Sequence, residues 1–249
     1  MTDLTTPTAD VGRALLLIAD IRGYTPFMKL HRTSLAHAQD VVGRLLEALI
    51  DAAPELTPLE IEGDATFLYT WAREPEPGHA TALLNNIVAM HQAFHACQQR
   101  MDAVNTCRCD GCRQVGQLRV KFVAHVGDVA IQRVKQSAKL AGLDVILVHR
   151  MLKSPVPVPE YALFSEALFA TAPAPLQARG HRVRGDLEGL GPTTMFFVEL
   201  DAVRDELPAV TSGSALASAR ENLGVVYRTF PYLIGVKRPR FAAAGRSGS

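Results

Sequence analysis

The sequence has no charge imbalance and no long apolar run, and each of these absences excludes a class of protein. Its 249 residues include 26 Lys and Arg against 25 Asp and Glu, so the net charge of +1 gives no electrostatic reason to expect a nucleic-acid partner. Apolar stretches such as residues 14–19 are far shorter than the roughly 20 residues that span a bilayer. The first residues also lack the basic and apolar regions of a secretory signal. We therefore expect a cytoplasmic protein with no membrane partner.

The distribution of apolar residues predicts an α+β fold. Hydrophobic residues make up 48% of the chain and charged residues 20%, as in globular proteins. Apolar runs bounded by turn residues predict strands at 13–19, 118–125, 127–134, 161–164, 180–184 and 194–200, with a hairpin over 59–71. Apolar residues at helical spacing predict helices at 33–53, 79–102 and 145–152. Because these strands and helices do not strictly alternate, we expect a mostly antiparallel sheet with helices on one face.

Two aspartates follow apolar β-runs and are the main chemical signal of the sequence. Asp20 closes the run of residues 15–19, and Asp64 follows Gly63 in the turn of the expected hairpin. Two carboxylates at neighbouring strand ends repel each other unless a cation lies between them. Oxygen ligands of this kind suit Mg²⁺ or Mn²⁺, which also bind phosphate oxygens. The pair therefore indicates a metal–nucleotide site.

Four segments resemble motifs of the class III nucleotidyl cyclase catalytic domain and occur in that family's order. They are residues 20–25, 60–64, 118–127 and 142–150. The resemblance covers roughly residues 12–200 and implies a ferredoxin-like βαββαβ domain in a divergent, cyclase-like branch of the family. Residues 201–249 are then a C-terminal arm, which is either a mobile tail or an apolar segment packed on the domain or on a second subunit.

The resemblance implies a two-metal mechanism. Asp20 and Asp64 would bind two Mg²⁺ or Mn²⁺ ions, with the Ile21 carbonyl as a further ligand. One ion would activate the ribose 3′-hydroxyl and the other would hold the triphosphate and the leaving pyrophosphate. Backbone amides at a helix start would bind the phosphates, because unpaired N–H groups there favour anions. These amides belong to the segment that contains Gly23, Tyr24, Thr25 and Phe27.

The resemblance also implies a homodimer. Arg150 matches the arginine that stabilises developing charge on the phosphoryl group. In the family the site lies between two catalytic domains, so the metal and the arginine would come from opposite subunits. Asp144 lies just before Arg150 and is either the cap of that helix or a polar group in nucleotide binding. His125 is expected to be a hydrogen-bonded histidine at a strand end and not a general base.

Several positions depart from the family's pattern and leave two functions open. Glu60 is typical of the guanylyl type, but Lys139 fits neither base specificity; it either pairs with Glu60 or meets a carbonyl-bearing base. Ile146 replaces the transition-state asparagine, and Glu188 falls near the position of a phosphate-binding lysine. The chain is therefore either a divergent cyclase that forms a cyclic nucleotide and pyrophosphate, or a degenerate domain that binds a metal–nucleotide or a protein partner. The base and the regulatory input are not determined by the sequence.

The cysteines form a second cluster, since all four lie within sixteen residues. Thiolates this close in a reducing compartment suit a structural Zn²⁺ better than disulfides. The predicted ligands are Cys97, Cys107, Cys109 and Cys112, with His91 and His95 as competitors for the fourth position. The alternative is free thiols in an exposed loop, which spans residues 105–116.

Overall fold

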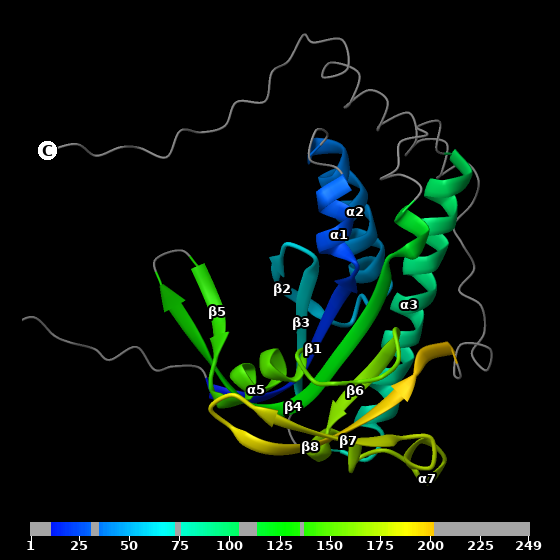
Figure 1. The fold of residues 1–249 in the computed structure, drawn as a ribbon. Coiled ribbons are helices and arrows are strands. Elements are labelled where there is room, and N and C mark those ends of the chain that lie inside the picture. The colour runs from blue at the N-terminus through cyan, green and yellow to red at the C-terminus, as the bar shows by residue number, and fades with distance from the viewer. Residues whose placement is uncertain (1–10, 31–34, 73–75, 105–113, 135–136, 202–249) are drawn as a thin grey trace, which may run out of the picture. The chain divides into compact units, whose positions relative to one another are not determined.

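A computed structural model describes residues 11–30, 35–72, 76–104, 114–134 and 137–201 (Figure 1). The chain divides into two units, residues 1–210 and 211–249, and the second lies wholly outside the described residues. The predicted C-terminal arm lies outside them as well, apart from residue 201. In the part of the chain that the structure describes, no helix is both long enough and apolar enough to cross a membrane.

The described elements are eight strands and seven helical segments. The strands are β1 (Val11–Arg22), β2 (Thr57–Glu62), β3 (Ala65–Ala72), β4 (Arg119–Val134), β5 (Ser137–Ala141), β6 (Tyr161–Ser165), β7 (His181–Leu187) and β8 (Gly191–Glu199). The helices are α1 (Tyr24–Leu30), α2 (Leu35–Asp51), α3 (His79–Val104), α5 (Leu143–Met151), α6 (Glu166–Phe169) and α7 (Ala174–Gln177), with a 3₁₀ turn at Val115–Gln117. The predicted α+β class is confirmed.

All eight strands belong to one sheet in the order β2-β3-β1-β4-β6-β8-β7, and β5 pairs with β4. Among the described strands, β4 and β6 are the one parallel pair, and the others run antiparallel. The half formed by β2, β3, β1 and β4 has the predicted βαββαβ connectivity, with α1 and α2 after β1 and α3 before β4.

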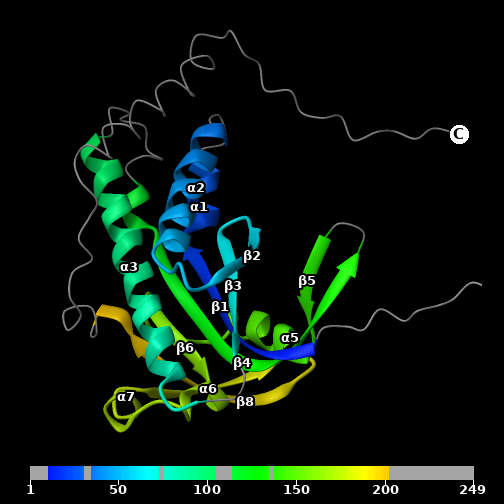
Figure 2. The same ribbon diagram turned by 180° about the vertical axis from the view of Figure 1, so that it is seen from behind.

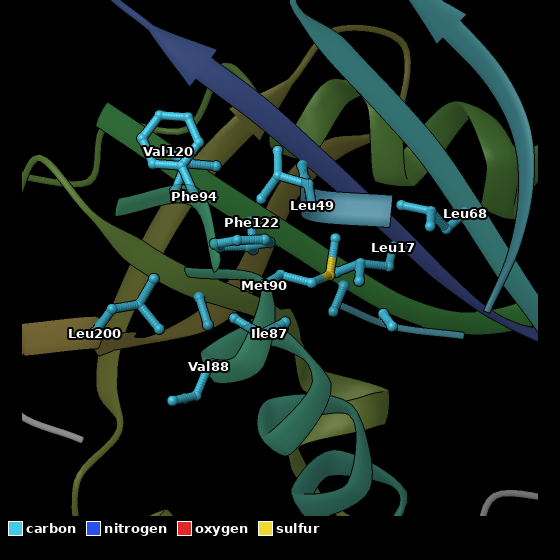
Figure 3. Packing of buried hydrophobic residues seen from close by; sticks show 14 of the residues in the cluster. Leu17, Leu49, Leu68, Ile87, Val88, Met90, Phe94, Val120, Phe122 and Leu200 are labelled. Atoms are coloured by element: carbon cyan, nitrogen blue, oxygen red, sulfur yellow. The ribbon is translucent and has the colours of Figure 1, made fainter. Parts of the chain in front are cut away.

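Helices cover both faces of the sheet, so the expectation of one covered face is wrong (Figure 1 and Figure 2). Leu15 and Leu17 of β1 belong to a core that includes residues of α2 and α3 (Figure 3). Leu16 and Ile18 belong to a second core that includes Val148 and Met151 of α5. Successive side chains of a strand point to opposite faces, and a continuous apolar run therefore indicates burial on both sides.

The two strands predicted at 118–125 and 127–134 form the single strand β4. Gly127 pairs with Ala14 of β1 in extended conformation and does not make a turn. The glycine is required there for another reason: an added Cβ would lie 2.2 Å from Cγ of Asp144. Its presence therefore reflects the close approach of α5 to β4 and not a break in the strand.

Candidate functional site

The fold brings Asp20 and Asp64 together at one end of the β1–β3 pair. Asp20 lies opposite Ala65, and the Ile21 N–H donates to the Asp64 carbonyl oxygen at 2.9 Å. Gly63, with φ of +63°, makes the tight turn between β2 and β3 that presents Asp64. Burial raises the pKa of Asp64, and the neighbouring Asp20 charge raises it further. The two carboxylates therefore interact, as expected of a pair that holds a cation.

Lys121 lies beside the acidic pair, a contact that was not predicted from the sequence. It lies opposite Asp20 on β4, with its Nζ atom 3.5 Å from Asp20 Oδ1. The same ammonium group donates to the Leu152 carbonyl oxygen at 3.1 Å. Its charge lowers the pKa of Asp64 and so opposes the effects of burial and of Asp20. The signal in the sequence was a lysine between buried apolar positions, at Val120 and Phe122.

Glu60 and Lys139, the two predicted base-selecting residues, form an ion pair. Lys139 Nζ lies 2.6 Å from Glu60 Oε1, which joins β2 to β5 across 79 positions of sequence. The hydrogen bond and the charge of Glu60 raise the pKa of Lys139. Of the two alternatives that the sequence left open, the structure shows direct pairing of these side chains.

The predicted phosphate-binding segment follows β1 directly. Gly23 has φ of +87° and leads into α1. The Phe27 N–H donates to the Gly23 carbonyl oxygen at 3.1 Å, and position 26 is a proline without an N–H. Phe27 is also buried in the core. The Phe27 amide is therefore used within the helix. The amides that remain predicted to bind phosphate are those of Gly23, Tyr24 and Thr25.

Arg150 lies near the end of α5 and forms an ion pair with Glu188 in the β7–β8 turn. Glu188 is thus the partner of the predicted transition-state arginine. Both residues line a hollow of about 390 Å³ together with Lys153, Arg184 and Asp186. Ile146 of the same helix is 49% exposed.

Asp144 is not the cap of α5, because Gly142 occupies the N-cap position. Its carboxylate instead accepts a hydrogen bond from the Asp128 N–H at 2.6 Å and lies 3.1 Å from His125 Nε2. These contacts join α5 to β4 at the place where Gly127 leaves room for the side chain. Asp144 therefore positions the helix that carries Arg150.

His125 is a buried, hydrogen-bonded histidine within β4. It is 4% exposed, and its Nδ1 atom lies 2.7 Å from Ser165 Oγ while Nε2 faces Asp144. Ser165 is itself engaged as the N-cap of α6, where its Oγ atom accepts from the Leu168 N–H. Burial lowers the pKa of His125, although the Asp144 carboxylate partly opposes this effect. The prediction of a satisfied histidine is confirmed, but its place at a strand end is wrong.

The lowered pKa of His125 predicts acid sensitivity. The folded state binds this proton less readily than the unfolded chain, whose histidine titrates near 6.5. Stability from the neutral form is therefore present above pH 6.5 and falls below it, by at most about 1.4 kcal/mol per pH unit. Urea unfolding at pH 5.5 and 7.5 measures this loss. His125→Gln is expected to show a smaller difference between the two pH values, and an equal difference would contradict the assignment.

The predicted zinc site lies mostly outside the described residues, which include Cys97 but not Cys107, Cys109 or Cys112. Cys97 is buried on α3, and its Sγ atom donates to the Arg44 carbonyl oxygen at 3.7 Å. His91 and His95 of α3, the two competitors for the fourth zinc position, contact Glu160, a residue for which no role was predicted. The spacing of four residues between His91 and His95 was the available signal, since it places both on one helix face.

Comparison with known sequences finds an uncharacterised relative. The chain is 35% identical over 212 residues to the uncharacterized protein Rv2561/Rv2562 of Mycobacterium tuberculosis (strain ATCC 25618 / H37Rv), covering 84% of this chain and 97% of that protein. Residues 42–161 match the model of a protein family described as of unknown function, DUF2652. Neither description states an activity.

Comparison with solved structures finds nucleotidyl cyclase domains. The adenylyl cyclase CyaB from P. aeruginosa matches with a TM-score of 0.59 at 15% identity, over 76% of this chain and 95% of that chain. A class III adenylyl cyclase-like ATP-binding protein from Pseudomonas aeruginosa matches with a TM-score of 0.56 at 15% identity, over 68% of this chain and 36% of that chain. The chain therefore has the fold of class III adenylyl and guanylyl cyclase catalytic domains.

Proposed function

Because the chain belongs to the same family as Rv2561/Rv2562 and has the cyclase catalytic fold, we propose that it binds a metal–nucleoside triphosphate. The observation that carries this proposal is the interacting pair Asp20 and Asp64, held at one end of neighbouring strands. A fold alone does not imply an activity, and the pair supplies the chemical argument.

The acidic pair fits Mg²⁺ or Mn²⁺. Its donors are carboxylate oxygens, which these hard ions prefer, and burial together with like charge raises the pKa of Asp64. Asp20 and Asp64 would hold the metal, with the Ile21 carbonyl as a further ligand. When bound, such ions polarise phosphate oxygens and make a ribose hydroxyl more acidic. When no metal is bound, Lys121 supplies part of the positive charge that the two carboxylates require.

The ion pairs of the site favour a nucleotide-binding module over an efficient cyclase. Arg150 forms an ion pair with Glu188. Position 188 thus holds a glutamate where a lysine would suit phosphate. Ile146 has no polar atom with which to hold ribose or phosphate. Loss of one such contact typically costs about 3 kcal/mol of transition-state stabilisation. We therefore propose that the domain signals through binding, with cyclic nucleotide formation as the second candidate because both aspartates are present.

The proposed nucleotide site lies between two copies of the chain. The first turns of α5 expose Leu143 at 66% and Ile146 at 49%, on the helix that carries Arg150. Exposed apolar side chains of this kind favour burial in an interface. In a homodimer, Arg150 of one subunit would face the acidic pair of the partner, and triphosphate would compete with Glu188 for the guanidinium group.

One experiment separates the two candidates. Purified protein is incubated with Mn²⁺ and each of the four nucleoside triphosphates, and binding, thermal stabilisation and cyclic product are measured in the same samples. Stabilisation without product supports the binding module, because a ligand of the folded state raises the melting temperature. Product that disappears in Asp64→Ala supports the cyclase. If no triphosphate gives either stabilisation or product, both candidate functions are contradicted.

Lys121→Gln is expected to strengthen Mn²⁺ binding. Removal of this ammonium leaves Asp20 and Asp64 with less compensating charge, so the metal-free protein becomes less stable and the affinity for a divalent ion rises. A gain of about fivefold corresponds to the value of about 1 kcal/mol for a partly exposed ion pair. Titration with Mn²⁺ measures it.

Arg119→Gln is the matched control for this variant. It removes a positive charge from the neighbouring position of β4, where the side chain donates to the Gly116 and Leu118 carbonyl oxygens instead. Its Mn²⁺ affinity should stay at the wild-type value. Unchanged or weaker Mn²⁺ binding by Lys121→Gln would be inconsistent with an acidic cation site.

A further inference from the structure

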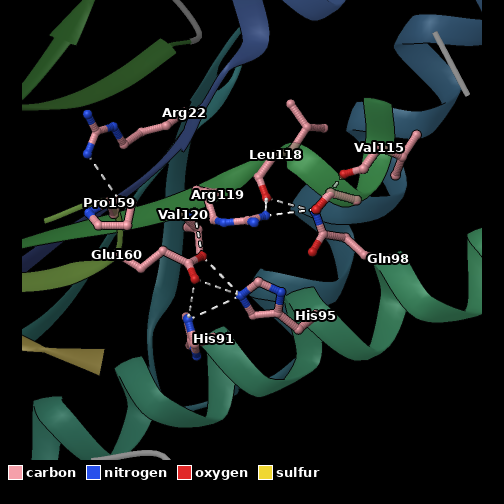
Figure 4. Close-up of polar contacts among 11 residues, drawn as sticks. Arg22, His91, His95, Gln98, Val115, Leu118, Arg119, Val120, Pro159 and Glu160 are labelled. Atoms are coloured by element: carbon pink, nitrogen blue, oxygen red, sulfur yellow. Dashed lines mark hydrogen bonds and ion pairs between the residues drawn. The ribbon is translucent and has the colours of Figure 1, made fainter. Parts of the chain in front are cut away.

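A second polar cluster lies on the opposite side of β4, away from the acidic pair. His91 and His95 project from one face of α3 toward Glu160, which immediately precedes β6 (Figure 4). His91 is fully buried, Glu160 is 7% exposed and the side chain of His95 is 24% exposed. Three chemically versatile groups thus converge under the long helix, and the proposed nucleotide site uses none of them.

The three ligand atoms lie at the separations that a bound metal ion requires. His95 Nε2 is 3.2 Å from His91 Nε2 and 3.1 Å from Glu160 Oε2, and His91 Nε2 is 3.3 Å from the same Glu160 oxygen. Metal–ligand bonds of about 2.0–2.2 Å place neighbouring ligand atoms about 2.9–3.5 Å apart in octahedral or tetrahedral geometry. All three separations fall within this range, so a single ion can lie within bonding distance of the three ligand atoms.

The charge of the cluster also requires a cation. With neutral imidazoles, Glu160 leaves a net negative charge among the buried apolar residues around α3, such as Phe94 and Val120. Glu160 Oε1 accepts from the Val120 N–H at 3.0 Å, and both imidazole Nε2 atoms lie within 3.3 Å of the carboxylate, contacts that suit its ionised form. An unpaired buried charge is costly. Either a proton on an imidazole or a metal ion must balance it.

The surroundings favour the metal. The Val120 N–H donates to Glu160 Oε1 at 3.0 Å and fixes the carboxylate from behind, as outer partners of metal ligands do. The partly exposed His95 gives a path from solvent.

We propose that His91, His95 and Glu160 bind one divalent transition-metal ion that clamps α3 to β4 and β6. Imidazole nitrogen suits zinc, iron, cobalt or nickel better than magnesium or calcium. Three protein ligands would leave at least one coordination position for water. This site is independent of the proposed nucleotide function. Its connection to β4 is the hydrogen bond from the Val120 N–H to Glu160, and this bond involves no side chain of the acidic pair.

The test uses the full chain in which Cys107, Cys109 and Cys112 are replaced by serine, so that thiolates do not compete for the metal. The protein is stripped with chelator and titrated with Zn²⁺ and with Co²⁺. We expect one ion per chain, a higher melting temperature, and visible Co²⁺ absorption without the charge-transfer band of a thiolate ligand. Failure to bind either ion stoichiometrically overturns the proposal.

Two substitutions assign the ion to the cluster. Glu160→Gln keeps the size of the side chain and its acceptor for the Val120 N–H, and His95→Gln changes the most exposed ligand. Each is expected to weaken binding by at least about 100-fold. His79→Gln, on the same helix but bonded to the Glu76 N–H, is the matched control and should bind normally.

Two further outcomes decide against the site. Binding that survives in both Glu160→Gln and His95→Gln overturns it. Loss of the ion in Asp64→Asn, with these two variants binding normally, would assign the ion to the acidic pair and also overturn it.

Circular dichroism of the metal-free variants shows that they fold. If Glu160→Gln does not fold, His95→Gln alone still decides, since its side chain is partly exposed.

Discussion

Replacement of Asp64 by asparagine is expected to weaken Mn²⁺-dependent nucleotide binding by at least about 100-fold, because a metal ligand is lost. The same substitution is expected to raise the melting temperature of the metal-free protein. Burial and the Asp20 charge disfavour the ionised form of Asp64 in the folded state, and a neutral amide of the same shape removes this cost. Calorimetric titration and thermal unfolding measure the two effects.

Opposite signs of the two effects are the signature of a binding site whose charges are held in place for a ligand. Glu62→Gln is the matched control, because it removes an exposed carboxylate from the same hairpin. It should change neither nucleotide binding nor stability appreciably. If Asp64→Asn binds the Mn²⁺–nucleotide as tightly as the wild type, the acidic pair is not the metal site and the proposed function fails.

Gly127→Ala is expected to destabilise the fold by about 2–4 kcal/mol, in the range of overpacked cores. An added Cβ would lie 2.2 Å from Cγ and 2.4 Å from Cβ of Asp144, so the clash involves the base of that side chain and not only its flexible end. Relief requires α5 to move away from β4 and breaks the hydrogen bond from the Asp128 N–H. Chemical denaturation measures the loss.

Gly43→Ala provides the control for this prediction. Gly43 lies inside α2, and an added Cβ would meet nothing within 4 Å. Alanine favours the helix by about 0.5–1 kcal/mol there, so this variant should be more stable than the wild type. The double variant Gly127→Ala/Asp144→Ala should recover part of the loss, since the clashing carboxylate is removed. A Gly127→Ala protein of wild-type stability would show that α5 is not fixed to β4 by this contact.

Local signals in the sequence predicted the parts of the site that depend on short segments. The hairpin that presents Asp64 was predicted because a Gly-Asp turn separates two strand-forming runs. Pairing of Glu60 with Lys139 was also one of two predicted alternatives, because the resemblance to class III cyclases places both residues near the nucleotide base. These predictions needed only the order of motifs along the chain.

Contacts that depend on strand register were not predicted. Lys121 reaches Asp20 because the register of β1 against β4 places them opposite each other, and no local pattern contains that register. Glu160 meets His95 across 65 positions of sequence, after a proline-containing segment without periodicity. The continuous strand β4 was divided in two because glycine was interpreted as a turn, although here it accommodates a neighbouring side chain.

The strand β4 has a consequence for how the family can vary. Four positions of β4 each meet a particular residue elsewhere in the chain. The Val120 N–H donates to Glu160, and Lys121 pairs with Asp20. His125 lies beside Asp144, and Gly127 leaves room for the same side chain. Deletion of a single residue within this stretch would rotate every following side chain to the wrong side of the sheet. Homologous chains are therefore expected to accumulate substitutions here but no insertions or deletions, whereas the ends of the sheet can change length.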